Sequence, residues 1–278
     1  MSLPQPTGRA HRGWDKHLAQ GGLNLHGLLV FFFIYAPIVI LVVYSFNSSR
    51  LVSVWEGFTF DWYARLFQNE AMGKALKNTL IVALSSTAIS TVFGTMVALV
   101  MERYQFWGKL PFDALLYLPI IIPDIAMAVM LLLFFIMTHI PLSLVTIIIS
   151  HVAFNISFVA VVVRARLADF DRSLEEAAKD LGANELQTFW RITLPLLMPG
   201  ILGGALLAFT LSVDDFVITF FTAGIGSTTL PLRIYSMVKL GITPEINALS
   251  TMMLLASMVL VALSLILQRK GGGAIEIG

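Results

Sequence analysis

Residues 164–185 read Arg164-Ala-Arg-Leu-Ala-Asp-Phe-Asp-Arg-Ser-Leu-Glu-Glu-Ala-Ala-Lys-Asp-Leu-Gly-Ala-Asn-Glu185, and this charged segment separates two long apolar stretches. Ser173 followed by Glu176 matches a capping box, which marks the start of a helix. Gly182 stands where a helix C-terminus favours glycine, and Asn184 or its neighbour can start a second helix that ends near Pro195. The segment predicts two short amphipathic helices that meet at a glycine corner and need a surface to cover.

The composition of the whole chain places these helices in a membrane protein. Of 278 residues, 57% are hydrophobic and 13% are charged, and the mean hydropathy is +0.83. A soluble domain carries about 25% charged residues, so a water-soluble single domain is not expected, and disordered and collagen-like chains are excluded. The absence of Cys excludes disulfides, thiol catalysis and thiolate metal sites.

Six apolar blocks are each long enough to cross a bilayer, which takes about 20 helical residues. They cover residues 26–46, 78–101, 112–137, 142–163, 196–222 and 246–267. Their continuous apolar character favours helices over barrel strands, so we expect an all-α integral membrane protein with six transmembrane helices. Residues 26–267 would form the membrane domain, with a charged loop at 164–195, a polar segment at 1–25 and a tail at 268–278.

The distribution of Lys and Arg predicts the orientation in the membrane. With the N-terminus in the cytoplasm, 12 basic residues lie on the cytoplasmic side and 6 on the other, counting the loops between the blocks. Both termini are therefore expected in the cytoplasm. The first apolar block is too long for a signal peptide and lacks a small-residue cleavage site, so it is expected to remain as an uncleaved span.

The charged loop resembles the signature of binding-protein-dependent ABC importer permeases. That signature is Glu-Ala-Ala, three residues, Gly, nine residues, Ile, one residue, Leu-Pro, and the loop fits it without a gap. In this family the loop forms coupling helices that sit in a cleft of the ATP-hydrolysing subunit. The resemblance implies that the ATPase-coupling residues are Glu176, Ala177, Ala178, Gly182, Leu194 and Pro195.

Other segments resemble the spermidine/putrescine-type permeases, and most closely the second of their two permease subunits. These segments are 41–50, Pro123-Asp124, 206–215 and 230–239. The resemblance implies the type I importer fold in the bacterial inner membrane, a different second permease, two ATPase subunits, an extracytoplasmic binding protein and a polyamine substrate. ATP and Mg would be bound by the ATPase subunits, and no cofactor, metal or nucleic acid is expected on this chain.

Three aspartates lie inside the apolar blocks, where charge is costly and usually functional. Asp124 follows Pro123, and neither Pro123 nor Pro119 donates a backbone hydrogen bond. A broken helix with free carbonyls and a carboxylate suits a cation, and transporters often bind substrate at such breaks. On a continuous helix, Asp214 and Asp215 would point about 100° apart.

The polar stripe in the fifth block favours Asp215 as the aspartate that faces the pathway. On a helix Asp215 aligns with Ser212 and Thr219, whereas Asp214 has mostly apolar neighbours and remains ambiguous. Hydrogen bonding between helices is the alternative role for each aspartate. The blocks contain no Lys or Arg, and His151 is the nearest candidate partner.

An acidic pathway suits a cationic substrate such as a polyamine. Aromatic walls would bind its ammonium groups, and the candidates are Tyr117, Phe209 and Phe216, although core packing is the more common role of such residues. The substrate-pathway prediction thus comprises Asp124, Asp214, Asp215, Ser212, Thr219, Phe216 and Tyr117.

Three alternatives stay open at this point. An intramembrane aspartyl protease would need different residues beside its aspartates. An ion-coupled secondary carrier or channel would use the same aspartates without the coupling loop. An ABC permease for another small organic solute would keep the loop. The chain lacks a phosphate-binding Gly-x4-Gly-Lys-Ser/Thr loop, so we expect a non-catalytic subunit.

Overall fold

The computed structural model describes residues 11–50, 54–240 and 244–272, so residues 1–10 and 273–278 of the predicted terminal segments lie outside the described residues. The chain divides into two compact units, one of residues 1–64 and 243–252 and the other of 65–242 and 253–278.

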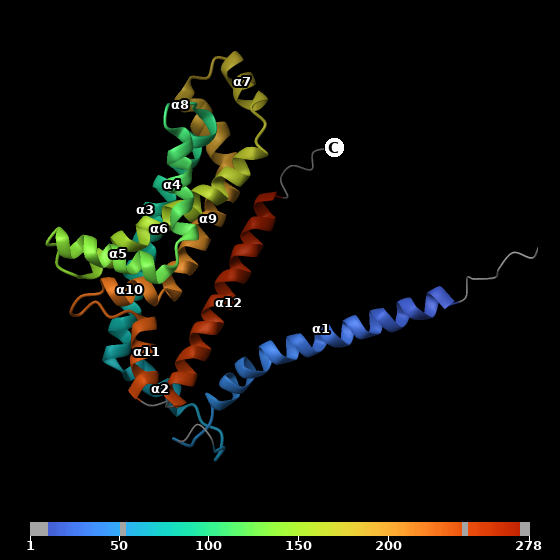
Figure 1. Ribbon diagram of the computed structural model, residues 1–278, viewed down its shortest axis with the longest axis vertical. Helices are drawn as coiled ribbons and strands as arrows, with labels where there is room; N and C mark the ends of the chain where they lie inside the picture. The colour runs from blue at the N-terminus through green and yellow to red at the C-terminus, as the bar shows by residue number, and fades with distance from the viewer. Residues whose placement is uncertain (1–10, 51–53, 241–243, 273–278) are drawn as a thin grey trace, which may run out of the picture. The chain divides into compact units, whose positions relative to one another are not determined.

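The described elements are helical, and Figure 1 labels them. They are α1 (His11–Tyr44), α2 (Asp61–Gln68), α3 (Glu70–Arg103), α4 (Lys109–Ile121), α5 (Asp124–Met137), α6 (Leu144–Ala168), α7 (Ser173–Asp180), α8 (Glu185–Thr188), the π-helix η1 (Phe189–Thr193), α9 (Leu194–Asp214), α10 (Val217–Thr222), α11 (Leu230–Leu240) and α12 (Pro244–Gly272).

Several of these helices have the length and apolarity needed to cross a membrane. Among the described residues these are 20–44, 70–103, 144–168 and 185–214, and the pair α4 and α5 qualifies together. They correspond to the first five predicted blocks. The 29-residue helix α12 covers the sixth block, and a total of six spans stays a prediction.

The core of the larger unit is built by α3, α6 and α9, which pack closely around Val159 of α6. Gly94 on α3 and Gly204 on α9 both face Val159, where an added Cβ would lie 2.7 Å and 3.3 Å from its atoms. Small residues let helix backbones approach in a membrane, where tight packing replaces the hydrophobic effect. This packing fixes α6 and α9, the two helices that carry His151 and Asp214.

Two predicted spans are interrupted. The third block divides at Ile122-Pro123, and α5 leaves α4 at an angle of 110°, which confirms the predicted break and makes it a sharp bend. The fifth block was expected to be one helix, and this is wrong: α9 ends at Asp214, and Asp215 has an extended backbone with ψ 123°. The helical-wheel comparison of the two aspartates therefore does not apply.

The helix that starts in the charged loop also differs from its prediction. It was expected to end near Pro195, but it continues through η1 into α9. Pro195 has no amide hydrogen and its ring crowds the preceding turn. The wider π turn, in which the amide of Leu194 bonds to the carbonyl of Phe189, lies directly before it and keeps the helix unbroken.

In the smaller unit, Asn47 organises the turn that follows α1. Its side chain donates to the Val54 carbonyl at 2.6 Å and accepts from the Glu56 amide at 3.1 Å. The Trp62 indole donates to the Asn47 carbonyl at 2.7 Å. The Trp62 side chain is buried and stabilises this turn.

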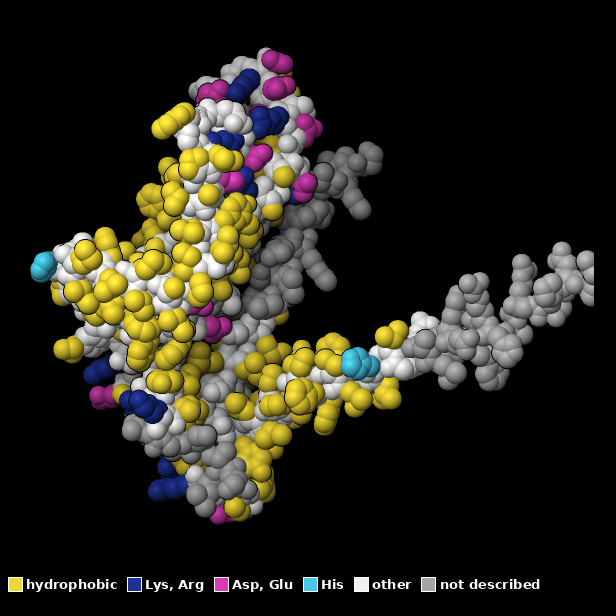
Figure 2. Space-filling model, viewed as in Figure 1, with side chains coloured by type: hydrophobic (Ala, Val, Ile, Leu, Met, Phe, Trp, Pro, Cys, Tyr) yellow, Lys and Arg dark blue, Asp and Glu magenta, His cyan; other side chains and the backbone are white. Residues whose placement is uncertain are grey.

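Charged side chains gather over α7 and α8, whereas α4 and α5 present mostly apolar side chains (Figure 2). Within the larger unit, α7 and α8 lie at one end of the core helices, and α11 lies toward the other (Figure 1). The charged end suits water, and the apolar surface suits lipid.

Candidate functional site: an acidic cavity at two helix breaks

Asp215 lies at the break between α9 and α10, and its carboxylate binds the start of α10. It accepts hydrogen bonds from the amides of Ile218 at 3.3 Å and Thr219 at 2.7 Å, and from the Thr219 hydroxyl at 2.7 Å. These bonds satisfy amides that a helix start leaves without partners, and the carboxylate also suits the positive end of the helix dipole. Asp215 thereby holds α10 in place.

His151 connects Asp215 to the three-helix core. Its Nε2 lies 3.2 Å from Asp215 Oδ2 and 3.0 Å from Thr219 Oγ1, and its Nδ1 lies 2.5 Å from Ser212 Oγ. The Ser212 hydroxyl in turn lies 2.9 Å from that of Ser86 on α3. A buried polar chain thus joins α3, α6, α9 and α10, and its members satisfy one another's hydrogen bonds.

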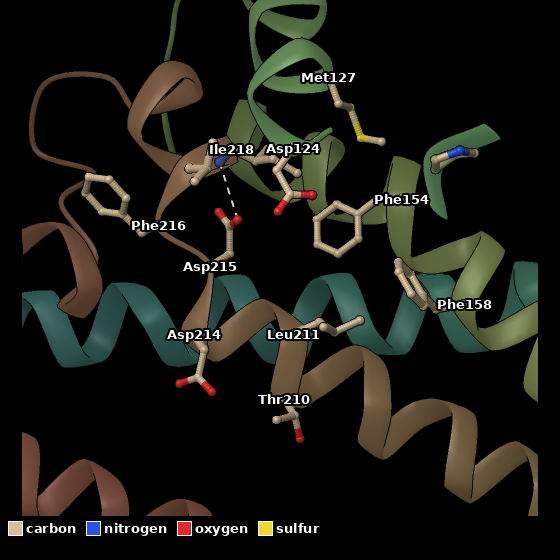
Figure 3. Close-up of a pocket in the computed structure, with 12 residues that line it drawn as sticks. Asp124, Met127, Phe154, Phe158, Thr210, Leu211, Asp214, Asp215, Phe216 and Ile218 are labelled. Carbon is tan, nitrogen blue, oxygen red and sulfur yellow. Dashed lines mark hydrogen bonds between the residues drawn. The ribbon is translucent and has the colours of Figure 1, made fainter. Parts of the chain in front are cut away.

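The two helix breaks meet at a cavity of about 350 Å³, named here the acidic cavity. Asp124 from the start of α5 and both Asp214 and Asp215 line it (Figure 3). The other lining residues are Pro119, Met127, Phe154, Phe158, Thr210, Leu211, Phe216, Val217 and Ile218. The described lining includes three carboxylates and no Lys or Arg, so the cavity favours a cation.

The three carboxylates differ in how far they are already bonded. Asp215 is largely buried and points toward Ile218, as the dashed line in Figure 3 marks, while Asp214 points away from it. Asp124 and Asp214 are exposed residues. Asp215 is therefore mainly occupied in binding α10, and Asp124 and Asp214 are the carboxylates that a ligand can reach.

Helix ends of both polarities border the acidic cavity. α4 ends at Ile121 and α9 ends at Asp214 beside the cavity, and α5 begins there at Asp124 and α10 at Val217. The last carbonyls of a helix lack intrahelical partners and carry the negative end of its dipole. Discontinuous helices place such ends around the coordinated ions of many transporters.

The structure brings together only part of the predicted pathway set. Phe216 lines the acidic cavity with the three aspartates, whereas Ser212 and Thr219 are buried and bonded to His151. Tyr117 on α4 is not among the lining residues. Sequence reasoning missed Phe154 and Phe158, whose spacing of four residues on α6 puts them on one helix face.

The charged loop forms its predicted glycine corner. Gly182 has φ 89°, its amide bonds to the carbonyl of Lys179, and the Ala183 amide bonds to that of Ala178, which is a Schellman motif. The expected capping box at Ser173 is absent. Instead, Asp171 accepts from the Ser173 amide at 2.9 Å, and this bond lowers the pKa of the Asp171 carboxyl.

The second loop helix begins at Asn184, as predicted, and has its own capping box with Gln187. The Glu175 carboxylate, in the first turn of α7, accepts hydrogen bonds from Arg103 of α3 and from Thr193. The charged end of the unit is therefore tied to the core by its own residues. Several apolar side chains of this loop are exposed. Leu181 is 90% exposed, and Leu174, Leu186 and Trp190 are also exposed.

Broken apolar helices around an acidic cavity, with an amphipathic helical loop at one end, define a membrane transport component. The sequence profile of the family described as "Binding-protein-dependent transport system inner membrane component" matches residues 74–270, and the chain belongs to this family. It is thus an ABC importer permease, the membrane subunit and not the ATP-hydrolysing one.

Two relatives named for polyamine transport cover most of the chain. The spermidine/putrescine transport system permease protein PotC of Haemophilus influenzae is 41% identical over 89% of this chain and 96% of its own. The putrescine transport system permease protein PotI of Escherichia coli K12 is 45% identical over 82% of this chain and 83% of its own.

Solved structures share the fold. A bacterial ABC transporter that imports the acidic polysaccharide alginate has a chain with a TM-score of 0.71 and 20% identity, covering 96% of this chain and 100% of its own. A chain of the alginate transporter in complex with a pentasaccharide-bound periplasmic protein has a TM-score of 0.72 and 19% identity, covering 94% and 98%. These similarities establish the permease fold.

Proposed function

We propose that the protein passes polyamines, such as spermidine or putrescine, through the bacterial cytoplasmic membrane as one permease of an ATP-driven importer. The acidic cavity carries this proposal. A ligand that enters it meets Asp124, Asp214 and the ring of Phe216, with no basic side chain among the described lining residues. This environment favours ammonium groups and disfavours anions. The relatives named for spermidine and putrescine support the same substrate class.

The proposed assembly comprises a different second permease, two ATPase subunits that bind ATP and Mg, and an extracytoplasmic binding protein. The exposed apolar side chains of the charged loop support the ATPase contact, because a water-facing surface rarely leaves such a patch uncovered. In this proposal Glu176, Ala177, Ala178 and Gly182 meet the ATPase, and Leu194 and Pro195 carry its motion into α9. Both termini lie in the cytoplasm.

The loop between α10 and α11 is the proposed contact for the binding protein. Asn78 on α3 donates to the carbonyls of Gly226 and Thr228 at 3.1 Å and 2.9 Å, and Thr79 accepts from the Leu230 amide at 2.8 Å. These bonds attach the loop to α3, and the Ile225 side chain is fully exposed. Closure of the ATPase dimer would open the acidic cavity to this side, and hydrolysis would return it to the cytoplasmic side.

The test is uptake of labelled spermidine and putrescine by proteoliposomes that contain the whole importer. We compare the native complex with Asp214→Asn, and use Asp169→Asn, which removes an exposed charge outside the acidic cavity, as the matched control. Because a hydrogen bond to a charged group contributes about 1.5–3 kcal/mol, uptake by Asp214→Asn should fall about 10-fold or more.

The control should transport as the native complex does. An importer that assembles and hydrolyses ATP but takes up neither amine would overturn the polyamine assignment and leave the family assignment intact. Uptake that persists without ATP and follows an ion gradient would instead indicate a secondary carrier.

A further inference from the structure

A second hollow lies next to the acidic cavity and shares two of its residues. This aromatic cavity has a volume of about 370 Å³, and its lining includes Asp214, Phe216, Pro231, Ile234, Tyr235 and Val238. Asp214 and Phe216 line both cavities. One carboxylate and one aromatic ring therefore form the boundary between them, and α11 supplies the opposite wall.

Three aromatic rings cluster at this boundary. The centroids of Phe216 and Tyr235 lie 4.6 Å apart, those of Phe216 and Phe220 lie 5.6 Å apart, and those of Phe220 and Tyr235 lie 6.3 Å apart. Tyr235 is 45% exposed and Phe220 is 52% exposed. About half of each of these two side chains therefore remains accessible to a ligand.

A carboxylate beside accessible aromatic rings has a specific binding chemistry. The faces of Phe and Tyr attract cations, and the attraction grows when the cation leaves water. Ile234 and Val238 supply an apolar wall, while Asp214 supplies the opposite charge. An alkylammonium group satisfies both features, since its charge meets the carboxylate and its methylenes meet the apolar wall.

We propose that the aromatic cavity is a second ammonium subsite, in which Phe216 and Tyr235 bind one end of a linear diamine or polyamine. This inference rests on the proposed function and adds a specificity residue, Tyr235, that the acidic cavity does not contain. The other ammonium end lies in the acidic cavity with Asp124, and Asp214 serves both ends. A substrate with two separated charges fills both cavities, whereas a monoamine fills one.

The experiment measures how uptake depends on substrate concentration for the whole importer in proteoliposomes. The variants are Tyr235→Leu, which keeps the apolar volume without the ring, Tyr235→Phe, which keeps the ring without the hydroxyl, and Ser236→Ala as a control. Ser236 neighbours Tyr235 on α11, is exposed and bonds only to its own helix at Leu232. Labelled putrescine and spermidine are the substrates, with ATP hydrolysis measured in parallel.

A cation–π contact contributes about 0.5–2 kcal/mol, so the KM of Tyr235→Leu should rise about 2- to 30-fold. Tyr235→Phe and Ser236→Ala should keep the native KM. Native uptake with an unchanged KM in Tyr235→Leu would overturn the aromatic subsite alone, and would fit a cavity filled by a lipid chain. Absence of amine uptake by the native importer would overturn the proposed function and the subsite together.

Discussion

His151 and Asp215 form a contact of 3.2 Å that joins α6 to the break between α9 and α10. The carboxylate also binds two amides of α10, and the imidazole also binds Ser212. Both residues are therefore used for positioning the helix break, and a ligand in the acidic cavity meets Asp214 and Asp124 more readily.

The first prediction concerns this pair. Replacing His151 with Leu leaves Asp215 without one of its donors inside a largely buried site, and an unsatisfied buried group costs about 1–3 kcal/mol. His151→Leu should therefore lower the thermal midpoint of the purified complex, and Asp215→Asn should do the same. In a double-mutant cycle the two losses should overlap by about 0.5 kcal/mol or more. Strict additivity would show that the two side chains act independently.

The second prediction concerns helix packing at Val159. A Cβ added at Gly94 would lie 2.7 Å from Val159 Cβ and 3.0 Å from the Ile156 carbonyl oxygen, so α3 and α6 must separate to admit it. Gly94→Ala should destabilise the protein by about 1–3 kcal/mol. Gly73→Ala is the matched control on the same helix, since no atom lies within 4 Å of its added Cβ. Equal thermal midpoints for the two variants would contradict the close packing.

The third prediction compares two ion pairs at the charged end. Glu175 is 13% exposed and binds Arg103, whereas Glu185 is 84% exposed and lies 2.7 Å from Lys179. A largely buried charge that loses its partner costs more than a surface pair, whose typical contribution is about 0–1 kcal/mol. Glu175→Gln should increase proteolytic cleavage of residues 164–195 markedly, and Glu185→Gln should change it little. A reversed order would show that Arg103 does not hold the loop.

The fourth prediction concerns the turn at Gly182. Its φ of 89° is costly for a residue with a Cβ, by about 1–2 kcal/mol, although no atom blocks the added group. Gly182→Ala should loosen the corner between α7 and α8 and reduce the amount of ATPase that co-purifies with the complex. Gly182→Asn should be milder, because Asn tolerates this conformation better. Full ATPase retention by Gly182→Ala would show that the corner is unnecessary for the contact.

The sequence predicted the parts of the fold that follow from local chemistry. Apolar length located the spans, Pro119 and Pro123 located a break, and Gly182 and Asn184 located the two loop helices. Each of these signals acts through the backbone of its own segment. The break after Asp214 has no proline or glycine beside it, and it depends on bonds from Asp215 to α10 and from His151 on α6.

The candidate site was predictable in its charge and only partly in its geometry. Intramembrane aspartates are rare enough to identify from the sequence, and the structure brings all three to one cavity. Which aspartate a ligand can reach depends on the path of the chain at the break. On a continuous helix the polar stripe favours Asp215, but the break leaves Asp215 bonded to α10 and Asp214 exposed. Tyr235 and Phe154 lie in other elements, and only packing brings them beside Asp214.

Residues 214–216 carry out three separate tasks in three consecutive positions. Asp214 borders both cavities, Asp215 anchors α10, and Phe216 contacts Tyr235. These tasks depend on the order of the residues along the chain. An insertion or deletion of one residue would move the carboxylate that anchors α10 into the position of the carboxylate that borders the cavities. Over evolutionary time this segment should therefore accept substitutions, such as one aromatic residue for another, more readily than any change in its length. Selection on such a junction acts on spacing as well as on side-chain identity.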